Sequence, residues 1–204
     1  TVTRRIGLDR ALLTSLPAAR SIVEDPSMLG LIHYAASYAG EPTFQIQSVI
    51  AETDGGRADP QTQLHADTFH PTAKAWLFLE DVAEDDGPVA YVPGSHRLTA
   101  ARLDWERQQS LTARDSPDRM HAEGSFRISD ADRVALSLPP AVRMAVPANT
   151  LVVADTSGFH ARSPSRRPSH RVEIDATLRR NPFLPWTGGH LRSMPPISGR
   201  HAAI

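Results

Sequence analysis

The segment His65-Ala66-Asp67 carries two side chains that could bind a metal ion. Residues i and i+2 of a β-strand point to the same side, and Thr62–Asp67 is a candidate for a short strand. On such a strand the imidazole of His65 and the carboxylate of Asp67 converge on one point. With nine histidines in 204 residues, the same spacing also arises by chance. The alternative is therefore a surface strand whose His and Asp face water.

A second histidine, His160, lies in the segment Gly158-Phe159-His160, after the buried-type strand Thr150–Asp155. If the fold brings His160 to the first pair, two imidazoles and one carboxylate form a facial triad. Such a triad leaves three octahedral positions of the metal open, which is the pattern of non-haem Fe(II) oxygenases. A bidentate 2-oxo acid takes two of the open positions, and O2 takes the third.

Arg171 stands eleven residues after His160 and opens the alternating strand Arg171–Leu178. A guanidinium is planar and binds a carboxylate at two points. We therefore expect Arg171 to bind the distal carboxylate of 2-oxoglutarate. Other nearby arginines lie in a Pro/Ser-rich loop, where we expect them to be solvated: Arg162, Arg166 and Arg167.

These residues need a scaffold, and the sequence predicts one built of short strands. Strands are expected over residues 43–52, 72–79, 89–92, 150–155 and 171–178. Helices are expected over Gly7–Leu16, Pro26–Tyr38 and 99–112, and an irregular charged segment over 113–130. Asp25 is a candidate N-cap with Pro26 in the first turn. Short strands, seventeen prolines and helices at the front indicate a mainly β protein with a double-sheet jelly roll.

Residues 87–96 read Gly-Pro-Val-Ala-Tyr-Val-Pro-Gly-Ser-His, a segment that resembles one in the phytanoyl-CoA dioxygenase (PhyH) family. The family order is His-x-Asp, an aromatic strand, this segment, a distal His and an Arg about eleven residues later. All five features occur here in that order. The resemblance covers roughly residues 43–178. Its most specific parts are the Pro-Gly-Ser-His segment and the His-to-Arg spacing.

The resemblance implies an Fe(II)- and 2-oxoglutarate-dependent dioxygenase. The implied fold is a double-stranded β-helix, a cupin-like jelly roll, with N-terminal and flanking helices. His65, Asp67 and His160 match the family's iron ligands, and Arg171 matches its 2-oxoglutarate arginine. The implied reaction uses O2 to hydroxylate an unactivated C–H bond of a small organic substrate, with release of succinate and CO2. Desaturation and cyclisation remain open, as does the substrate itself.

Three further residues are candidates for contacts to the organic ligands. Trp76 falls where members of the family can carry a tryptophan lining the cosubstrate pocket, and the alternative is an ordinary core aromatic. Gln47 is a candidate contact to 2-oxoglutarate, because Arg162 replaces the small or hydroxyl residue that is common two positions after the distal His. Lys74 shares the expected face of Trp76, where it would contact a substrate or cosubstrate carboxylate. The alternative for Lys74 is the exposed end of its strand.

The composition suits one globular domain, with 204 residues of which 40% are hydrophobic. The absence of cysteine excludes disulfides and thiolate metal sites. A net charge of −1 gives no reason to expect a nucleic-acid partner, and no apolar run is long enough for a membrane span. Because no signal-peptide pattern opens the chain, we expect a cytoplasmic protein. The expected parts of the single oxygenase domain are a helical N-terminal support over 1–40, a core over 43–178 with an insertion over 99–145, and a C-terminal extension over 179–204.

Two other functions fit the same residues. A cupin-like metalloenzyme would use the triad without 2-oxoglutarate, and Arg171 would then be dispensable. A non-catalytic jelly-roll binding domain would hold no metal at the triad. The sequence leaves the oligomeric state undetermined.

Overall fold

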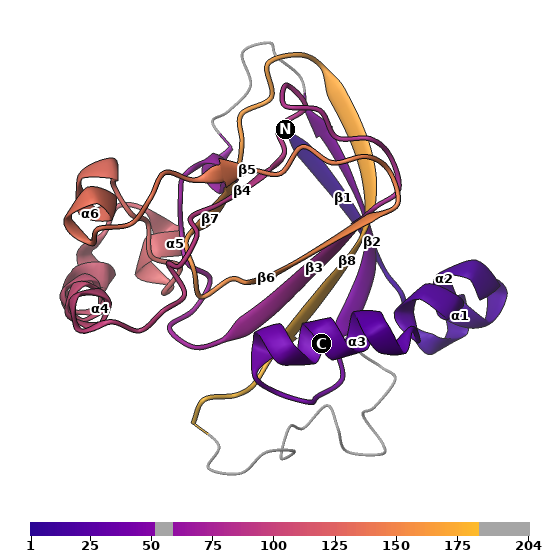
Figure 1. The fold of residues 1–204 in the computed structure, drawn as a ribbon, viewed down its shortest axis with the longest axis horizontal. Helices are drawn as coiled ribbons and strands as arrows, with labels where there is room; N and C mark the ends of the chain where they lie inside the picture. Colours follow the sequence, from indigo (N-terminus) through magenta and orange to yellow (C-terminus); the bar gives the residue numbers. More distant parts are fainter. Residues whose placement is uncertain (52–58, 184–204) are drawn as a thin grey trace.

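The described part of the chain, residues 1–51 and 59–183 of a computed structural model, forms two antiparallel sheets flanked by helices (Figure 1). The first sheet has the strand order β1-β2-β8-β3-β6, with bounds Val2–Gly7, Thr43–Ala51, Ser169–Arg179, Thr72–Phe78 and Thr150–Asp155. The second has the order β5-β4-β7, with bounds Val142–Arg143, Val89–Tyr91 and His160–Arg162. The five expected strands are thus confirmed, except that residue 52 lies outside the described residues.

Strand β8 shows how the first sheet separates two kinds of side chain. Ile174, Ala176 and Leu178 lie in apolar clusters with residues of the N-terminal helices. The alternate positions face a cavity between the sheets and are polar: Arg171, Glu173, Asp175 and Thr177. The strand therefore has one apolar face and one polar face, and both are largely buried.

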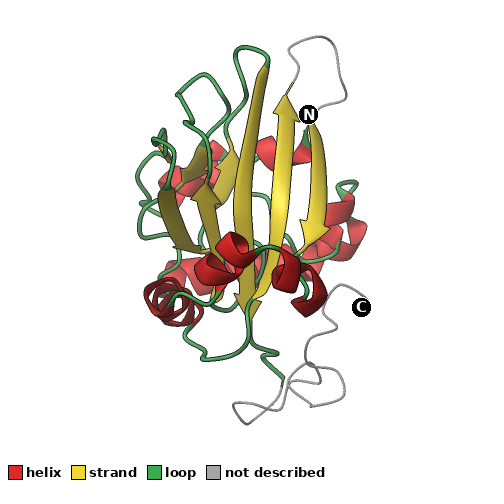
Figure 2. Ribbon diagram, turned by 90° about the vertical axis from the view of Figure 1, so that its right-hand side faces the viewer, coloured by secondary structure: helices red, strands yellow, loops and turns green. Residues whose placement is uncertain are grey.

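Helix α3 (Pro26–Ala36) covers the apolar face of the first sheet, and Figure 2 shows the long strands side by side behind the helices. Asp25 caps it by accepting from the backbone N–H of Met28 (2.8 Å), and Pro26 occupies the first turn, as expected. The helix ends at Ser37, which takes the left-handed conformation. Small side chains on the sheet let the helix approach closely, and they belong to one cluster: Ala73, Ala75 and Ala176.

The prediction of a helix over Gly7–Leu16 is partly wrong. Gly7 ends β1, and helix α1 spans Arg10–Ser15, followed by α2 over Pro17–Val23. Strand β1 was not expected, because its side chains are mostly exposed and give no alternation of apolar and polar residues. It forms because its backbone pairs with β2 at the edge of the sheet.

The prediction of a strand over Thr62–Asp67 is also wrong. Residues Pro60–Thr62 form a 3-10 turn (η1), and His65 makes isolated bridges to Arg127 and His160. No regular ladder forms, because the segment lies between two separate parts of the chain and bonds to each in turn. The amide of residue 66 donates to Phe126, whereas that of Asp67 donates to Thr156. The segment is nevertheless extended enough to place His65 and Asp67 on one side, as shown below.

Helix α4 (Ala100–Thr112) is confirmed, with Thr99 as its N-cap. The expected irregular segment contains a 3-10 turn η2 (Ala113–Asp115) and α5 (Arg119–Ala122), and α6 (Asp130–Ala135) follows. These helices gather on the side of the molecule opposite α1, α2 and α3 (Figure 1). Their core is a cluster of buried side chains: Ala66, Val92, Trp105, Ile128 and Phe159. None of the helices within the described ranges has the length and hydropathy needed to cross a bilayer.

A buried arginine joins α4 to the segment before His160. The guanidinium of Arg102 donates to Glu106 (2.7 Å) and to the carbonyl oxygens of Ser95 (2.5 Å) and Ser157 (2.8 Å). Its central carbon lies 4.1 Å from the ring centroid of Phe159. Ser95 in turn accepts from the amide of Phe159 (2.7 Å). The Pro-Gly-Ser-His segment therefore has a structural role, because it holds the backbone that presents His160.

We expect Arg102→Met to lower the free energy of unfolding by about 3–5 kcal/mol, because the change leaves the Glu106 carboxylate buried without a cation. The matched control is Arg20→Met. Arg20 pairs with Glu24, and the two side chains are 58% and 59% exposed. The control change should cost less than about 1 kcal/mol. Urea denaturation followed by circular dichroism measures both changes. Equal losses in the two variants would contradict the bracing role of Arg102.

Candidate metal centre

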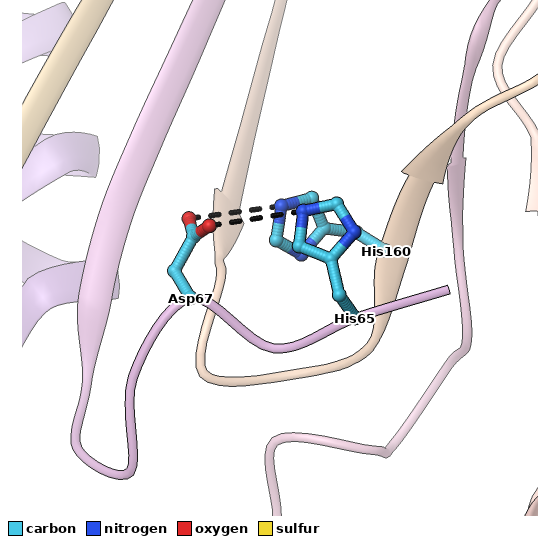
Figure 3. A group of neighbouring side chains, drawn as sticks. All are labelled: His65, Asp67 and His160. Carbon is cyan, nitrogen blue, oxygen red and sulfur yellow. Dashed lines mark ion pairs between the residues drawn. The ribbon is translucent and has the colours of Figure 1, made fainter. Parts of the chain in front are cut away.

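The structure brings His65, Asp67 and His160 together. One ligand atom from each residue can be chosen so that all three atoms lie within 4.8 Å of one another. Nε2 of His65 lies 3.8 Å from Oδ1 of Asp67, and Nε2 of His160 lies 3.6 Å from its Oδ2. Figure 3 shows the two imidazole rings and the carboxylate directed at the same point. Nitrogen and oxygen atoms at these separations can bind a single ion of the first transition series.

The backbone positions the two histidines. The amide of His65 donates to the carbonyl oxygen of His160, and the amide of His160 donates to that of His65, both at 2.9 Å. His65 thereby joins the end of the second sheet, because His160 begins β7. The amide of Asp67 donates to Thr156 (2.9 Å), which fixes the loop on the other side.

Hydrogen bonds to the other ring nitrogen set the tautomer of each histidine. Nδ1 of His65 lies 2.7 Å from the carbonyl oxygen of Gln63, and Nδ1 of His160 lies 3.1 Å from that of Gly158. A carbonyl oxygen only accepts, so Nδ1 carries the proton in both rings. Each Nε2 then presents its lone pair toward Asp67, which is the form of histidine that binds a metal.

Burial and neighbouring charges give the triad the protonation states of metal ligands. Burial lowers the pKa of His160 to about 3 and also lowers the pKa of His65. Burial raises the pKa of Asp67, but the nearby charge of Lys74 and the other polar neighbours outweigh it and bring that pKa to about 2. At neutral pH the site thus consists of two neutral imidazoles and one carboxylate, and it needs to lose no proton before a metal binds.

Lys74 is the direct neighbour of this carboxylate. Its Nζ lies 2.8 Å from Oδ2 of Asp67, which makes the two residues an ion pair. The sequence left Lys74 either at the exposed end of its strand or facing a carboxylate of substrate or cosubstrate. Its side chain is 26% exposed, and the carboxylate that it faces belongs to the triad.

A cavity of about 240 Å³ lies beside the triad, and His65 and His160 form part of its wall. The other residues proposed from the sequence for ligand contacts line the same cavity: Gln47, Lys74, Trp76 and Arg171. They come from three neighbouring strands of the first sheet, β2, β3 and β8, and point inward by the alternation of each strand. Trp76 is both a cavity residue and a core residue, since it also packs with Phe78 and Val82.

Arg171 is buried and already has partners in the protein. Its Nε donates to Glu173 (3.1 Å), and its Nη1 donates to the carbonyl oxygen of Gly87 (2.7 Å). Glu173 is 1% exposed and accepts a second hydrogen bond from the side-chain amide of Gln47 (2.5 Å). Nη2 donates no hydrogen bond to any residue within the described ranges. The guanidinium thus keeps one edge for a ligand.

The sequence analysis missed several cavity residues. Glu173 and Asp175 follow Arg171 at two-residue spacing on β8, and this alternation was the available signal that they point inward. Arg162 was expected to be solvated, which is wrong. It belongs to β7, lines the cavity and pairs with Asp59 at 2.7 Å. The neighbouring Arg166 and Arg167 are exposed, as expected.

The fold is similar to those of several solved structures. The non-heme alpha ketoglutarate dependent epimerase SnoN from nogalamycin biosynthesis has a TM-score of 0.51 and 19% identity, with 93% of this chain and 71% of SnoN covered. A structure of SnoN in complex with Fe3+, alpha ketoglutarate and nogalamycin RO has a TM-score of 0.53 and 20% identity, with 93% and 73% covered. HygX from Streptomyces hygroscopicus with iron bound has a TM-score of 0.52 and 14% identity, with 96% and 79% covered. At these identities the likeness concerns the fold alone.

A search of curated proteins found no match. The sequence does match the phytanoyl-CoA dioxygenase (PhyH) family over residues 4–148. This match spans more than half of the 204 residues and includes His65 and Asp67, and it ends before His160 and Arg171. The chain therefore belongs to the phytanoyl-CoA dioxygenase (PhyH) family.

Proposed function

We propose that this chain is a non-haem Fe(II)- and 2-oxoglutarate-dependent oxygenase with a double-stranded β-helix, or jelly-roll, fold. The observation that carries the proposal is the convergence of two neutral imidazoles and one carboxylate beside a cavity that also contains Arg171. Membership of the PhyH family supports it, as does a fold shared with structures that hold iron or Fe3+ and alpha ketoglutarate.

In this proposal His65, Asp67 and His160 hold Fe(II). Two histidines and one carboxylate suit Fe(II) and leave three coordination positions for 2-oxoglutarate and O2. When bound, the metal would let O2 act as the oxidant, with 2-oxoglutarate as the co-reductant: one oxygen atom would enter succinate as CO2 leaves, and the other would oxidise a substrate C–H bond. The protein's contribution is to fix the ligands, hold the organic molecules and limit the access of water.

Arg171 binds the distal carboxylate of 2-oxoglutarate through its free edge. Glu173 and the carbonyl oxygen of Gly87 hold the guanidinium in place, so little side-chain entropy is lost when the ligand arrives. Gln47 acts through Glu173, to which it donates, and Trp76 forms an apolar wall. With Asp67 on a metal, Lys74 would lose this partner, and its ammonium would be available for a carboxylate of substrate or cosubstrate.

Hydroxylation of a small organic substrate is the outcome that we favour. Halogenation would need a metal position for a halide, and the carboxylate of Asp67 takes that position. Desaturation and cyclisation use the same residues. The solved structures with this fold include an epimerase, so the fold does not choose among these outcomes.

One observation favours a second candidate function, a cupin-like metalloenzyme that does not use 2-oxoglutarate. Arg171 already has an internal carboxylate partner in Glu173, at 3.1 Å. If this pair is purely structural, the metal site operates without a 2-oxo acid. The two functions differ in whether Arg171 contributes to cosubstrate affinity.

We expect the anaerobic protein with Fe(II) and 2-oxoglutarate to show the weak visible charge-transfer band of the chelated metal. His160→Ala should abolish the band and weaken Fe(II) binding, measured by calorimetry, by at least about 100-fold, because even residues that only orient metal ligands contribute 10–100-fold. His96→Ala is the matched control, since His96 is exposed and lies outside the triad. A band that persists in His160→Ala, or is absent from the parent protein, would refute the metal assignment.

We expect Arg171→Lys to raise the dissociation constant for 2-oxoglutarate by about 100-fold while Fe(II) affinity stays within about twofold. Lysine keeps a positive charge beside Glu173, which protects the fold, but it lacks the planar pair of donors. Titration of the charge-transfer band with 2-oxoglutarate measures the constant. Arg167→Lys serves as control, since this residue is 59% exposed. An unchanged constant in Arg171→Lys would favour the metalloenzyme without 2-oxoglutarate.

A further inference from the structure

Asp175 is a buried acid at the centre of the cavity wall. It lies on β8, directly opposite Gln45 of β2 and Trp76 of β3. Only 5% of its surface is exposed, and all three residues line the cavity. Residues that face each other across strands have their Cβ atoms about 5 Å apart, so the three side chains are immediate neighbours.

The carboxylate of Asp175 has one hydrogen-bond partner. The side-chain amide of Gln45 donates to its Oδ1 at 2.6 Å. Elsewhere in the described part of the chain no donor reaches Oδ2 and no cation comes within 4.0 Å. Its neighbour Glu173, in contrast, pairs with Arg171. Burial raises the pKa of Asp175, which reflects the cost of leaving this charge without a counter-ion.

Three of the four lysine and arginine residues that line the cavity pair with acids other than Asp175. Lys74 pairs with Asp67, Arg162 with Asp59 and Arg171 with Glu173. Arg5 donates to the side-chain oxygen of Gln47 at 2.7 Å. Asp175 is thus a lining acid without a direct ion pair, and the cationic charges that act on it are those of Lys74 and Arg5. A buried carboxylate is stabilised when a cation pairs with it, and a ligand can supply that cation.

The position of Asp175 suits a substrate group close to the metal. Lys74 contacts the metal ligand Asp67 and is also near enough to lower the pKa of Asp175 by its charge. Asp175, Lys74 and the two histidines of the triad all line the same cavity. Trp76, on the neighbouring strand, adds an aromatic ring, and ammonium groups bind favourably over such rings.

The rest of the lining agrees with a polar ligand. Twelve of the fifteen residues that line the cavity are polar or charged, the apolar ones being Trp76, Val89 and Ala161. An acyl chain would remove water from these polar groups without replacing their hydrogen bonds.

We propose that Asp175, with Gln45 and Trp76, binds an ammonium group of the substrate, so that this enzyme acts on a small amine rather than on an acyl chain. The reaction of the amine rests on the proposed function. Its binding does not, because the binding site consists of residues outside the triad. The inference therefore predicts selective amine binding by the protein without metal.

The test uses three probes of one shape, cyclohexylamine, cyclohexanol and cyclohexanecarboxylate, titrated into the metal-free protein at pH 7. Calorimetry and saturation-transfer NMR measure their dissociation constants. We expect the amine, which is protonated at this pH, to bind at least about 10-fold more tightly than the other two, because only it pairs with the buried carboxylate. If the amine does not bind more tightly than both cyclohexanol and cyclohexanecarboxylate, the proposal is overturned.

Asp175→Asn keeps an oxygen that can accept from Gln45 but removes the charge, and it should eliminate the preference for the amine. Asp104→Asn removes the same charge from an exposed position on α4 and should leave the preference unchanged. A preference retained in Asp175→Asn would overturn the assignment of the site.

The charge-transfer band separates this inference from the proposed function. With Fe(II) and 2-oxoglutarate, Asp175→Asn should keep the band, which shows that the triad is intact and that only substrate binding has changed. Selective amine binding by a parent protein without the band would support the amine site and reject the oxygenase. A parent protein that shows the band but does not prefer the amine would support the oxygenase and reject the amine site.

Discussion

The reciprocal backbone contact between His65 and His160 is the feature on which the rest of the site depends. Each amide donates to the carbonyl oxygen of the other residue at 2.9 Å, although the two are far apart in the sequence. Residues paired in this way across antiparallel segments send their side chains to the same side. The two rings lie 4.5 Å apart between centroids as a result. This pairing therefore places two of the three candidate ligands, and the third, Asp67, lies on a loop whose backbone bonds to Thr156.

The polar inner face of the first sheet also fixes how its strands align. Gln45 pairs with Asp175, and Gln47 with Glu173, and both pairs are register partners of β2 and β8. A slip of one residue would turn the two acids toward the apolar side covered by the helices. Burying them there without partners would be costly. The same side chains that could serve binding thus also select the strand register.

The regular parts of the fold could be predicted from the sequence, because β3, β8 and α3 follow simple periods and helix-capping rules. Strand β1 could not, since it is defined by its backbone pairing with β2 and not by a buried face. The candidate metal ligands could be chosen from their spacing and from the family resemblance. The backbone bridge between His65 and His160 could not be predicted, because it joins segments that are far apart in the sequence. Arg162 was misread for the same reason, because its partner Asp59 is distant in the sequence.

The pairing of Arg171 with Glu173 changes how a carboxylate ligand would be recognised. The charge of the guanidinium is already balanced by a carboxylate 3.1 Å away, so an incoming carboxylate meets a neutral pair and not an isolated cation. What Arg171 still offers is direction, because Glu173 and Gly87 fix the plane of its remaining N–H groups. Under the proposed function, chelation at the metal would then supply most of the binding free energy of 2-oxoglutarate. Arg171 would mainly select a ligand of the right length, and metal binding would precede cosubstrate binding.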